Sequence, residues 1–159
     1  MYERRVRLVL GKPPTVLQVE AANSYEYVAT IATRLYITEQ TANILKRRTE
    51  VFAAPLLAET RPLEKARYLR RWARRLKDFA FSSEDAIVLA YGSFGLDVEL
   101  KTVGVDAIIT TDIRLAEHYG RRHPEIKNRF DDMIVNLPES YAALRLPQVL
   151  TTAAILSIA

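Results

Sequence analysis

The sequence predicts an α/β fold in which helices pack against a mostly parallel central sheet. Short apolar segments typical of strands alternate along the chain with longer segments of helical periodicity. Strands joined through helices run parallel, because the helix returns the chain to the same end of the sheet. With 159 residues, of which 49% are hydrophobic and 26% charged, the chain can bury a sizeable core. No internal repeat or low-complexity linker interrupts it, so we expect one domain over residues 1–144 and an apolar tail over residues 145–159.

Three strands are expected early in the chain, over residues 5–10 (RVRLVL), 15–19 (TVLQV) and 34–38 (RLYIT). The turn signal GKPP at residues 11–14 separates the first two. Asn23 or Ser24 would cap a short helix before the third strand. After that strand, Thr38 is a favourable N-cap for the helix EQTANILKRR, and Glu39 in its first turn suits the positive end of the helix dipole.

The clearest helix in the sequence is PLEKARYLRRWARRLKDFA, which begins with Thr60 and Pro62. Apolar side chains recur in it at helical spacing and should face the core: Leu63, Ala66, Leu69, Trp72 or Ala73, Leu76 and Phe79. The opposite face is rich in arginine, at Arg67, Arg70, Arg71, Arg74 and Arg75. This basic face is either a solvated helix surface or a surface that binds RNA phosphates or an acidic partner segment.

The second half of the chain predicts further helices and strands in alternation. Ser82 or Ser83 caps the helix EDAIVLAYGSF, and residues 106–110 (DAIIT) form a strand. The helix DIRLAEHYG follows, with Gly120 as its expected C-terminal stop. Residues 133–136 are expected as a last strand before the short helix PESYAAL.

Two aspartates lie where a charge has either a structural or a chemical role. Asp112 follows the strand at residues 106–110, and in a parallel α/β sheet ligands bind outside the carboxyl ends of the strands. Asp85 begins a different helix, where a carboxylate interacts favourably with the helix dipole. Each aspartate is therefore either a helix cap or part of a charged site at the edge of the sheet.

The segments SSEDAIVLAYGSF, VDAIITTDIRLA and MIVNLPESYAAL, in this order, resemble the carboxyl-terminal half of a PIN domain. In that family an aspartate opens a helix, a second aspartate follows a strand in a T-x-D arrangement, and a final strand leads into a P-E-x-F-like helix. The matching positions here are Asp85, Thr110-Thr111-Asp112 and Pro138-Glu139-Ser140-Tyr141. The resemblance extends from about Thr15 to Leu144 and implies a three-layer PIN-like fold.

PIN domains are typically magnesium- or manganese-dependent ribonucleases, and many are toxins paired with an antitoxin. Their acidic cluster holds a divalent metal that activates water for attack on a phosphodiester. The resemblance thus implies a metal-dependent ribonuclease or nuclease-like protein that acts on RNA, with Mg²⁺ or Mn²⁺ as cofactor. Asp85 and Asp112 would be the metal ligands, and RNA and an antitoxin-like protein would be the partners. Hard cations of this kind prefer carboxylate oxygen.

The amino-terminal half departs from the family pattern at both of its acidic positions. The family's first strand ends in an aspartate, whereas the counterpart here is Gln18; Glu20, two residues further on, is the replacement candidate. The family's second acid is a glutamate that falls near Asn43 or Ile44, and Glu39 lies one turn before Asn43. The candidate catalytic set is therefore Asp85, Asp112, Glu39 and Glu20. The alternative is a catalytically inactive PIN-like module that binds RNA or a protein partner.

Charge and composition bear on the partner and the compartment. A formal charge of +4 mildly favours an anionic partner, and the basic residues nearest the expected site are Arg114, Arg121, Arg122 and Lys127. The absence of cysteine excludes thiolate chemistry and fits a cytoplasmic location. No signal peptide is evident, and the tail is too short to span a bilayer, so no membrane partner is expected. The tail would instead add an edge strand or pack against a second subunit in a homo-oligomer.

Overall fold

The computed structural model describes residues 15–47 and 53–158, and the chain divides into two units. Unit 1 comprises residues 1–62 and 151–159, and unit 2 comprises residues 63–150. The strand and turn expected before residue 15 lie outside the described residues. The single domain over residues 1–144, with a tail after it, stays a prediction.

The described part of unit 1 is mostly helical. Its elements are α2 (Val16–Ile31), β1 (Leu35–Thr38), α3 (Glu39–Lys46), α4 (Ala53–Glu59) and α8 (Thr152–Leu156). Helices α2 and α8 pack together, and the hydroxyl of Thr152 donates a hydrogen bond to the carboxylate of Glu20. Thr38 caps α3 through its hydroxyl, which accepts a hydrogen bond from the amide of Thr41, so the expected cap is confirmed.

The strand expected at residues 15–19 is wrong, because this segment forms the first turn of α2. Thr15 and Gln18 form a capping box: the Thr15 amide donates to Gln18 Oε1 at 2.9 Å, and the Gln18 amide donates to Thr15 Oγ1 at 3.3 Å. These two bonds satisfy amides that a helix start leaves without partners. The helix expected to begin at Asn23 or Ser24 is therefore already under way at those residues.

Two small sheets make the fold mixed α/β, so the expected class is confirmed. The larger sheet has the order β1-β2-β3-β4, where β2 is Thr60–Lys65, β3 is Gly95–Asp97 and β4 is Thr102–Val103. Strand β3 pairs antiparallel with both β2 and β4, so this sheet is not the mostly parallel one that was expected. The reason is local: the Asp97 carboxylate accepts hydrogen bonds from the amides of Glu99 and Leu100, which stabilises a tight hairpin in place of a helical crossover.

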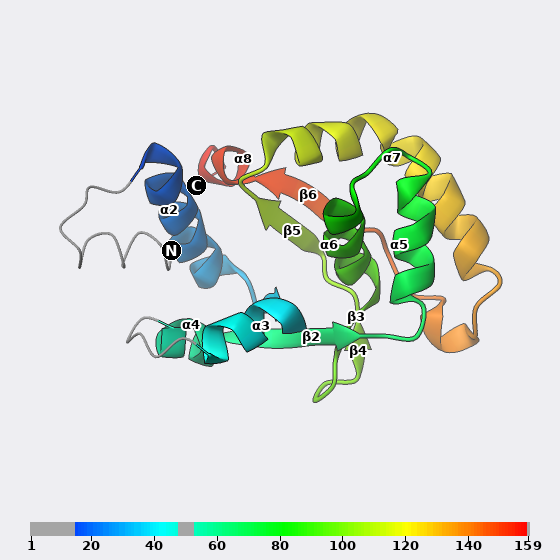
Figure 1. Ribbon diagram of the computed structural model, residues 1–159, viewed down its shortest axis with the longest axis horizontal. Helices are drawn as coiled ribbons and strands as arrows, with labels where there is room; N and C mark the ends of the chain where they lie inside the picture. Colours follow the sequence, from blue (N-terminus) through cyan, green and yellow to red (C-terminus); the bar gives the residue numbers. More distant parts are fainter. Residues whose placement is uncertain (1–14, 48–52, 159) are drawn as a thin grey trace. The chain divides into compact units, whose positions relative to one another are not determined.

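The smaller sheet pairs β5 (Ala107–Thr110) with β6 (Gln148–Thr151). The two arrows point the same way in Figure 1, so the pair is parallel, and the Gln148 amide donates to the Asp106 carbonyl at 2.8 Å. Part of the tail thus adds a strand beside β5, which is one of the two roles expected for it.

The long helix expected from residue 62 begins later than predicted, at α5 (Leu69–Lys77). Residues 60–65 form β2 instead, in register with β3 through Glu64 opposite Leu96. A partner strand that is distant in sequence supplies these hydrogen bonds, and it overrides local helix propensity. The expected apolar stripe is nevertheless buried from Leu63 to Leu76, and Trp72 is part of the core.

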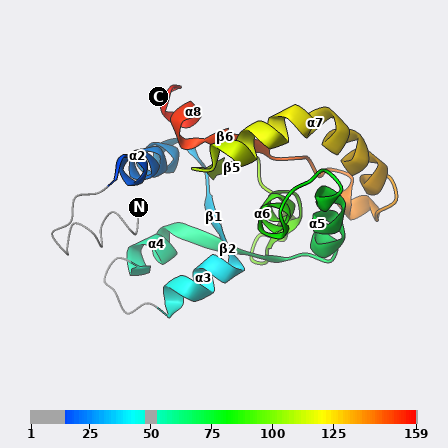
Figure 2. The ribbon, with the colours of Figure 1, turned by 45° about the horizontal axis from the view of Figure 1, so that its top comes forward.

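Three further elements complete unit 2: α6 (Ser83–Phe94), α7 (Ile113–Ile134) and the 3₁₀ turn η1 (Glu139–Tyr141). Ser82 caps α6, as expected. The stop expected at Gly120 is wrong, because α7 continues through Gly120 and Pro124. Proline removes one helical hydrogen bond and crowds the preceding turn, and α7 is bent in both views (Figure 1; Figure 2).

The last strand expected at residues 133–136 is also wrong. Met133 and Ile134 lie in the final turn of α7, and the Asn136 side chain donates to the carbonyl of Asp132 at 2.8 Å. This bond satisfies a carbonyl that the helix end leaves free, so the apolar side chains there belong to a helix terminus.

Candidate functional site

The starts of α6 and α7, which carry Asp85 and Asp112, lie near one another in unit 2. The carboxyl-terminal part of α6 packs against β5 so closely that a Cβ on Gly92 would lie 2.6 Å from Ile108 Cδ1. Gly104, at the approach to β5, has a φ of +83° and donates its amide to the Gly95 carbonyl at 2.8 Å. The carboxyl-terminal end of α6 thus lies beside β5, the strand that leads to Asp112.

Contacts between the segment before α6 and the helix α7 support the same placement. His118 Nε2 lies 2.8 Å from the Phe79 carbonyl oxygen, within hydrogen-bond distance, and its ring packs edge-on against Phe81 at 4.7 Å. His118 is in the second turn of α7, and Phe81 shortly precedes α6. We call this region, where α6 and α7 begin and β5 ends, the aspartate end of unit 2; it is defined by Asp85 and Asp112.

Asp85 lies in the first turn of α6 and takes part in its cap. The Asp85 amide donates to Ser82 Oγ at 3.1 Å, and Ser82 Oγ donates to Asp85 Oδ2 at 2.7 Å. The side chain is half-buried. These two bonds fix the carboxylate at the amino-terminal end of the helix, where its charge is favourable.

Asp112 is the N-cap of α7. Its Oδ1 accepts a hydrogen bond from the Leu115 amide at 3.0 Å, and its own amide donates to Thr110 Oγ1 at 3.0 Å. Asp112 is therefore a helix cap, and Asp85 is a first-turn residue beside the Ser82 cap, as the structural interpretation of the two aspartates expects. A cap does not preclude a second role, since each carboxylate has two oxygens.

The donor chemistry of this pair fits a hard divalent cation. In the described part of the chain, Asp85 Oδ1 and Asp112 Oδ2 have no hydrogen-bond or ion-pair partner. Mg²⁺ is commonly bound through one or two carboxylates and keeps several of its waters, so two free carboxylate oxygens match its requirement. Among the described residues, no group of three or more His, Asp or Glu side chains is arranged to hold a metal.

The two replacement carboxylates lie in unit 1 and serve local roles there. Glu20 is on α2 and accepts the hydrogen bond from Thr152, and Glu39 is in the first turn of α3. Gln18, the expected counterpart of the family's first aspartate, is in the α2 capping box and not at the end of a strand. Asn43 lies exposed on α3. The T-x-x-Q spacing of Thr15 and Gln18 is the sequence signal that indicates this helix start.

The four basic residues expected to contact phosphate all lie on α7, at different distances from the aspartate end. Arg114 is exposed in the first turn, and Arg121 follows nearly two turns later on the same face. Arg122 contacts Glu125 at 2.9 Å, and Lys127 contacts Asp131 at 2.5 Å. Because α7 does not stop at Gly120, Lys127 is carried about 22 Å along the helix from Asp112.

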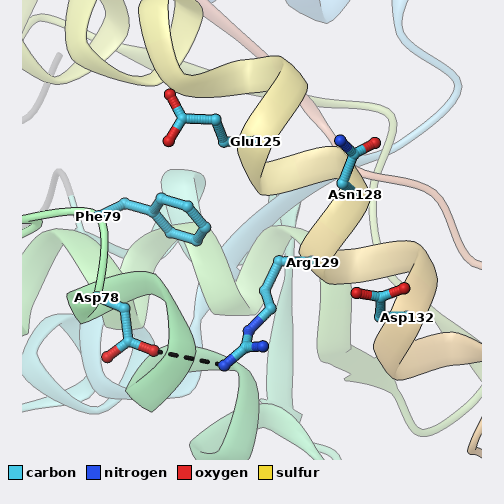
Figure 3. Close-up of a pocket in the computed structure, with 6 residues that line it drawn as sticks. All are labelled: Asp78, Phe79, Glu125, Asn128, Arg129 and Asp132. Atoms are coloured by element: carbon cyan, nitrogen blue, oxygen red, sulfur yellow. Dashed lines mark ion pairs between the residues drawn. The ribbon is translucent and has the colours of Figure 1, made fainter.

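A shallow pocket elsewhere in unit 2 lies between the segment after α5 and the later turns of α7. It is lined by Asp78, Phe79, Glu125, Asn128, Arg129 and Asp132. Figure 3 shows Arg129 extending from α7 toward Asp78, with Nη2 at 3.8 Å from Oδ2. Glu125 is already paired with Arg122. The pocket includes neither Asp85 nor Asp112, so it is not the predicted site.

Comparison of the chain with models of protein families found no match, and comparisons with curated proteins and with solved structures found none either. Within the described residues, no helix is both long and apolar enough to cross a membrane.

Proposed function

We propose that this chain is a PIN-like protein that acts on RNA and holds Mg²⁺ or Mn²⁺ through Asp85 and Asp112. The observation that supports this proposal best is that α6 and α7 begin near one another in unit 2, where β5 also ends. Two carboxylates are held there by caps, and each has one oxygen left over. The three-layer PIN-like arrangement is part of the same proposal.

Each residue of the proposed site has a defined task. The Ser82 hydroxyl and the Leu115 amide orient the two carboxylates, so that little side-chain freedom is lost when a cation binds. A bound divalent cation supplies a water of lowered pKa and positive charge beside the phosphate. Arg114, exposed in the first turn of α7, is the nearest of the four basic residues in sequence for a phosphate contact, and Arg121 extends the same face.

Metal binding is tested by the thermal stability of the full chain with and without millimolar Mn²⁺. We expect a rise in melting temperature, because binding at about tenfold the Kd stabilises a fold by roughly 1.4 kcal/mol. The variant Asp85→Asn, Asp112→Asn should lose this rise and keep its helices, because asparagine retains an oxygen acceptor and caps as well as aspartate.

The matched control is Asp106→Asn, which removes an exposed carboxylate at the opposite end of β5. This variant should respond to Mn²⁺ as the unchanged chain does. A stabilisation that persists in the Asp85→Asn, Asp112→Asn variant, or that disappears in Asp106→Asn, would place the metal elsewhere.

A second candidate is a PIN-like module that binds RNA without cleaving it. The observation that favours it is Gln18, which lies in a helix cap of unit 1 and offers no carboxylate. The two candidates differ in one assay, the cleavage of a labelled RNA with Mn²⁺ present. Cleavage that requires both Asp85 and Asp112 supports the nuclease. RNA binding and Mn²⁺ stabilisation without cleavage support the binding module.

A further inference from the structure

The exposed side of α5 carries only cations. Leu69, Trp72, Ala73 and Leu76 are buried, and the positions between them place Arg70, Arg71, Arg74 and Lys77 in solvent, with Arg75 half-buried. No acidic residue lies within α5. Arg70, Arg74 and Lys77 are spaced by four and three residues, so they form one row along the helix. We call Arg70, Arg71, Arg74, Arg75 and Lys77 the α5 basic face.

Among the described residues, no carboxylate pairs with four of the five cations of the α5 basic face. These four cations are Arg70, Arg71, Arg74 and Lys77. Burial lowers the pKa of Arg75 and the guanidiniums of Arg129 and Arg71 lower it further, whereas the carboxylates of Asp132 and Asp78 partly oppose this shift. Like charges are therefore held close together here, and an anion bound at this face would relieve their repulsion.

The α5 basic face leads toward the aspartate end. Helices α5 and α6 lie side by side in both views and are joined by a short loop, so α5 ends where α6 begins (Figure 1; Figure 2). Lys77, the last residue of α5, is thus at the end of unit 2 that holds Asp85. A strand that follows the row from Arg70 to Lys77 would run toward the two aspartates.

We infer that the α5 basic face binds the phosphate backbone of single-stranded RNA and guides it toward the aspartate end. A protein partner fits this face less well, because protein interfaces are anchored by buried apolar and aromatic side chains, and the exposed positions of α5 offer none. A polyanion needs no such anchor, since arginine contacts phosphate through paired hydrogen bonds and the release of counterions drives binding. The inference rests on the proposed action on RNA.

The test measures binding of a labelled short uridine oligonucleotide to the full chain in EDTA, over a series of salt concentrations. The variant Arg70→Gln, Arg74→Gln removes two exposed charges and keeps residues of similar helix propensity. We expect affinity for the oligonucleotide to fall roughly tenfold and the salt slope to decrease by about 1.4, since each phosphate contact on a single strand contributes about 0.7.

The matched control is Lys46→Gln, Arg47→Gln at the end of α3, which removes two exposed charges from unit 1. Its affinity and salt slope should be unchanged. Equal losses in both variants, or no loss in the α5 variant, would overturn the inference. A polyglutamate peptide of the same charge that binds as tightly as the oligonucleotide would also overturn it, in favour of an acidic protein segment.

The assay separates this inference from the proposed metal site, because EDTA removes divalent cations. RNA binding that depends on Arg70 and Arg74, together with no Mn²⁺ stabilisation, would uphold the α5 basic face and contradict the metal site. Stabilisation by Mn²⁺ that requires Asp85 and Asp112, together with RNA binding that is unchanged in the Arg70→Gln, Arg74→Gln variant, would uphold the metal site and contradict the α5 basic face as the RNA-binding surface.

Discussion

Helices α5 and α7 pack in the same unit and both carry many basic side chains, but the surroundings of these cations differ. On α7, Arg122 contacts Glu125 and Lys127 contacts Asp131, so these two charges are compensated within the helix, whereas Arg114 and Arg121 have no ion-pair partner among the described residues. On α5 no acid is present, and Arg71 and Arg75 are like charges four residues apart. Paired cations stabilise their own helix slightly, whereas unpaired cations remain available to a ligand. Under the proposed action on RNA, the difference favours α5 over the paired part of α7 as a phosphate-binding surface.

The largest effect on stability is expected from truncating a side chain in the core between α5 and α7. Trp72 on α5 is fully buried and packs edge-on against Phe130 of α7, with ring centroids 5.1 Å apart. Trp72→Ala should lower the free energy of unfolding by about 3–5 kcal/mol, because it removes a large side chain from a packed interior. Urea denaturation measures this loss. Trp72→Phe keeps an aromatic ring and should cost markedly less; equal costs would show that the α5–α7 packing is not tight.

A smaller effect is expected at the buried side of α7. The Tyr119 hydroxyl donates to the Pro147 carbonyl at 3.0 Å, and burial raises the pKa of Tyr119 above its ordinary value. Tyr119→Phe leaves that carbonyl without its donor and should cost about 1–3 kcal/mol near neutral pH.

The raised pKa of Tyr119 also predicts a dependence on pH. A tyrosine in the unfolded chain has a pKa of about 10. Burial raises the pKa of Tyr119 in the folded protein, so its phenol stays protonated to higher pH. Its contribution is thus fully present below about pH 10 and is lost as the pH rises further. Unfolding free energies across this range should fall less steeply in Tyr119→Phe than in the unchanged chain. Parallel curves for the two proteins would rule out a raised pKa at this site.

The smallest effects on stability are expected from removing single surface charges on α5 and on α7. Arg71→Gln removes one member of the like-charge pair with Arg75 and should stabilise α5 by roughly 0.2–0.5 kcal/mol at low salt. Arg122→Gln breaks an opposite-charge pair and should destabilise α7 by a similar amount. Both changes should shrink as salt is added. Changes of the same sign in the two variants, measured by chemical denaturation, would mean that the helices do not differ in charge compensation.

Features set by a few neighbouring residues were predicted from the sequence. Thr38 and Ser82 are helix caps, and the buried stripe from Leu69 to Leu76 lies where its spacing indicates. The strand at residues 107–110 and the helix that follows Asp112 are also present. In each case the signal is a cap or a period that acts within one or two turns.

Features that depend on distant partners were not predictable in this way. Glu64 and Lys65 pair with β3, a segment some thirty positions away, so a proline followed by helix-forming residues became the strand β2. A short apolar segment such as TVLQV is ambiguous between strand and helix, and the Thr15–Gln18 box decides it. Gly120 adopts helical φ, because nothing at that exposed position requires a left-handed conformation.

The candidate site shows the same division. That Asp85 and Asp112 begin helices follows from their local sequence. That the two helices begin at one end of unit 2 depends on the close approach of Gly92 to Ile108 and on the contact of His118 with Phe79. Neither contact can be predicted from the spacing of residues in the sequence. The order of the segments indicated that the two aspartates belong together, but not which contacts bring their helices together.

The most direct test of the aspartate end uses the paramagnetism of Mn²⁺. Substoichiometric Mn²⁺ added to the ¹⁵N-labelled full chain broadens the amide signals of residues close to the bound ion. The account predicts that the first residues of α6 and of α7 broaden together, and that both effects disappear in Asp85→Asn, Asp112→Asn but persist in Asp106→Asn. Broadening at only one of the two helix starts, or at neither, would contradict a metal site shared by Asp85 and Asp112.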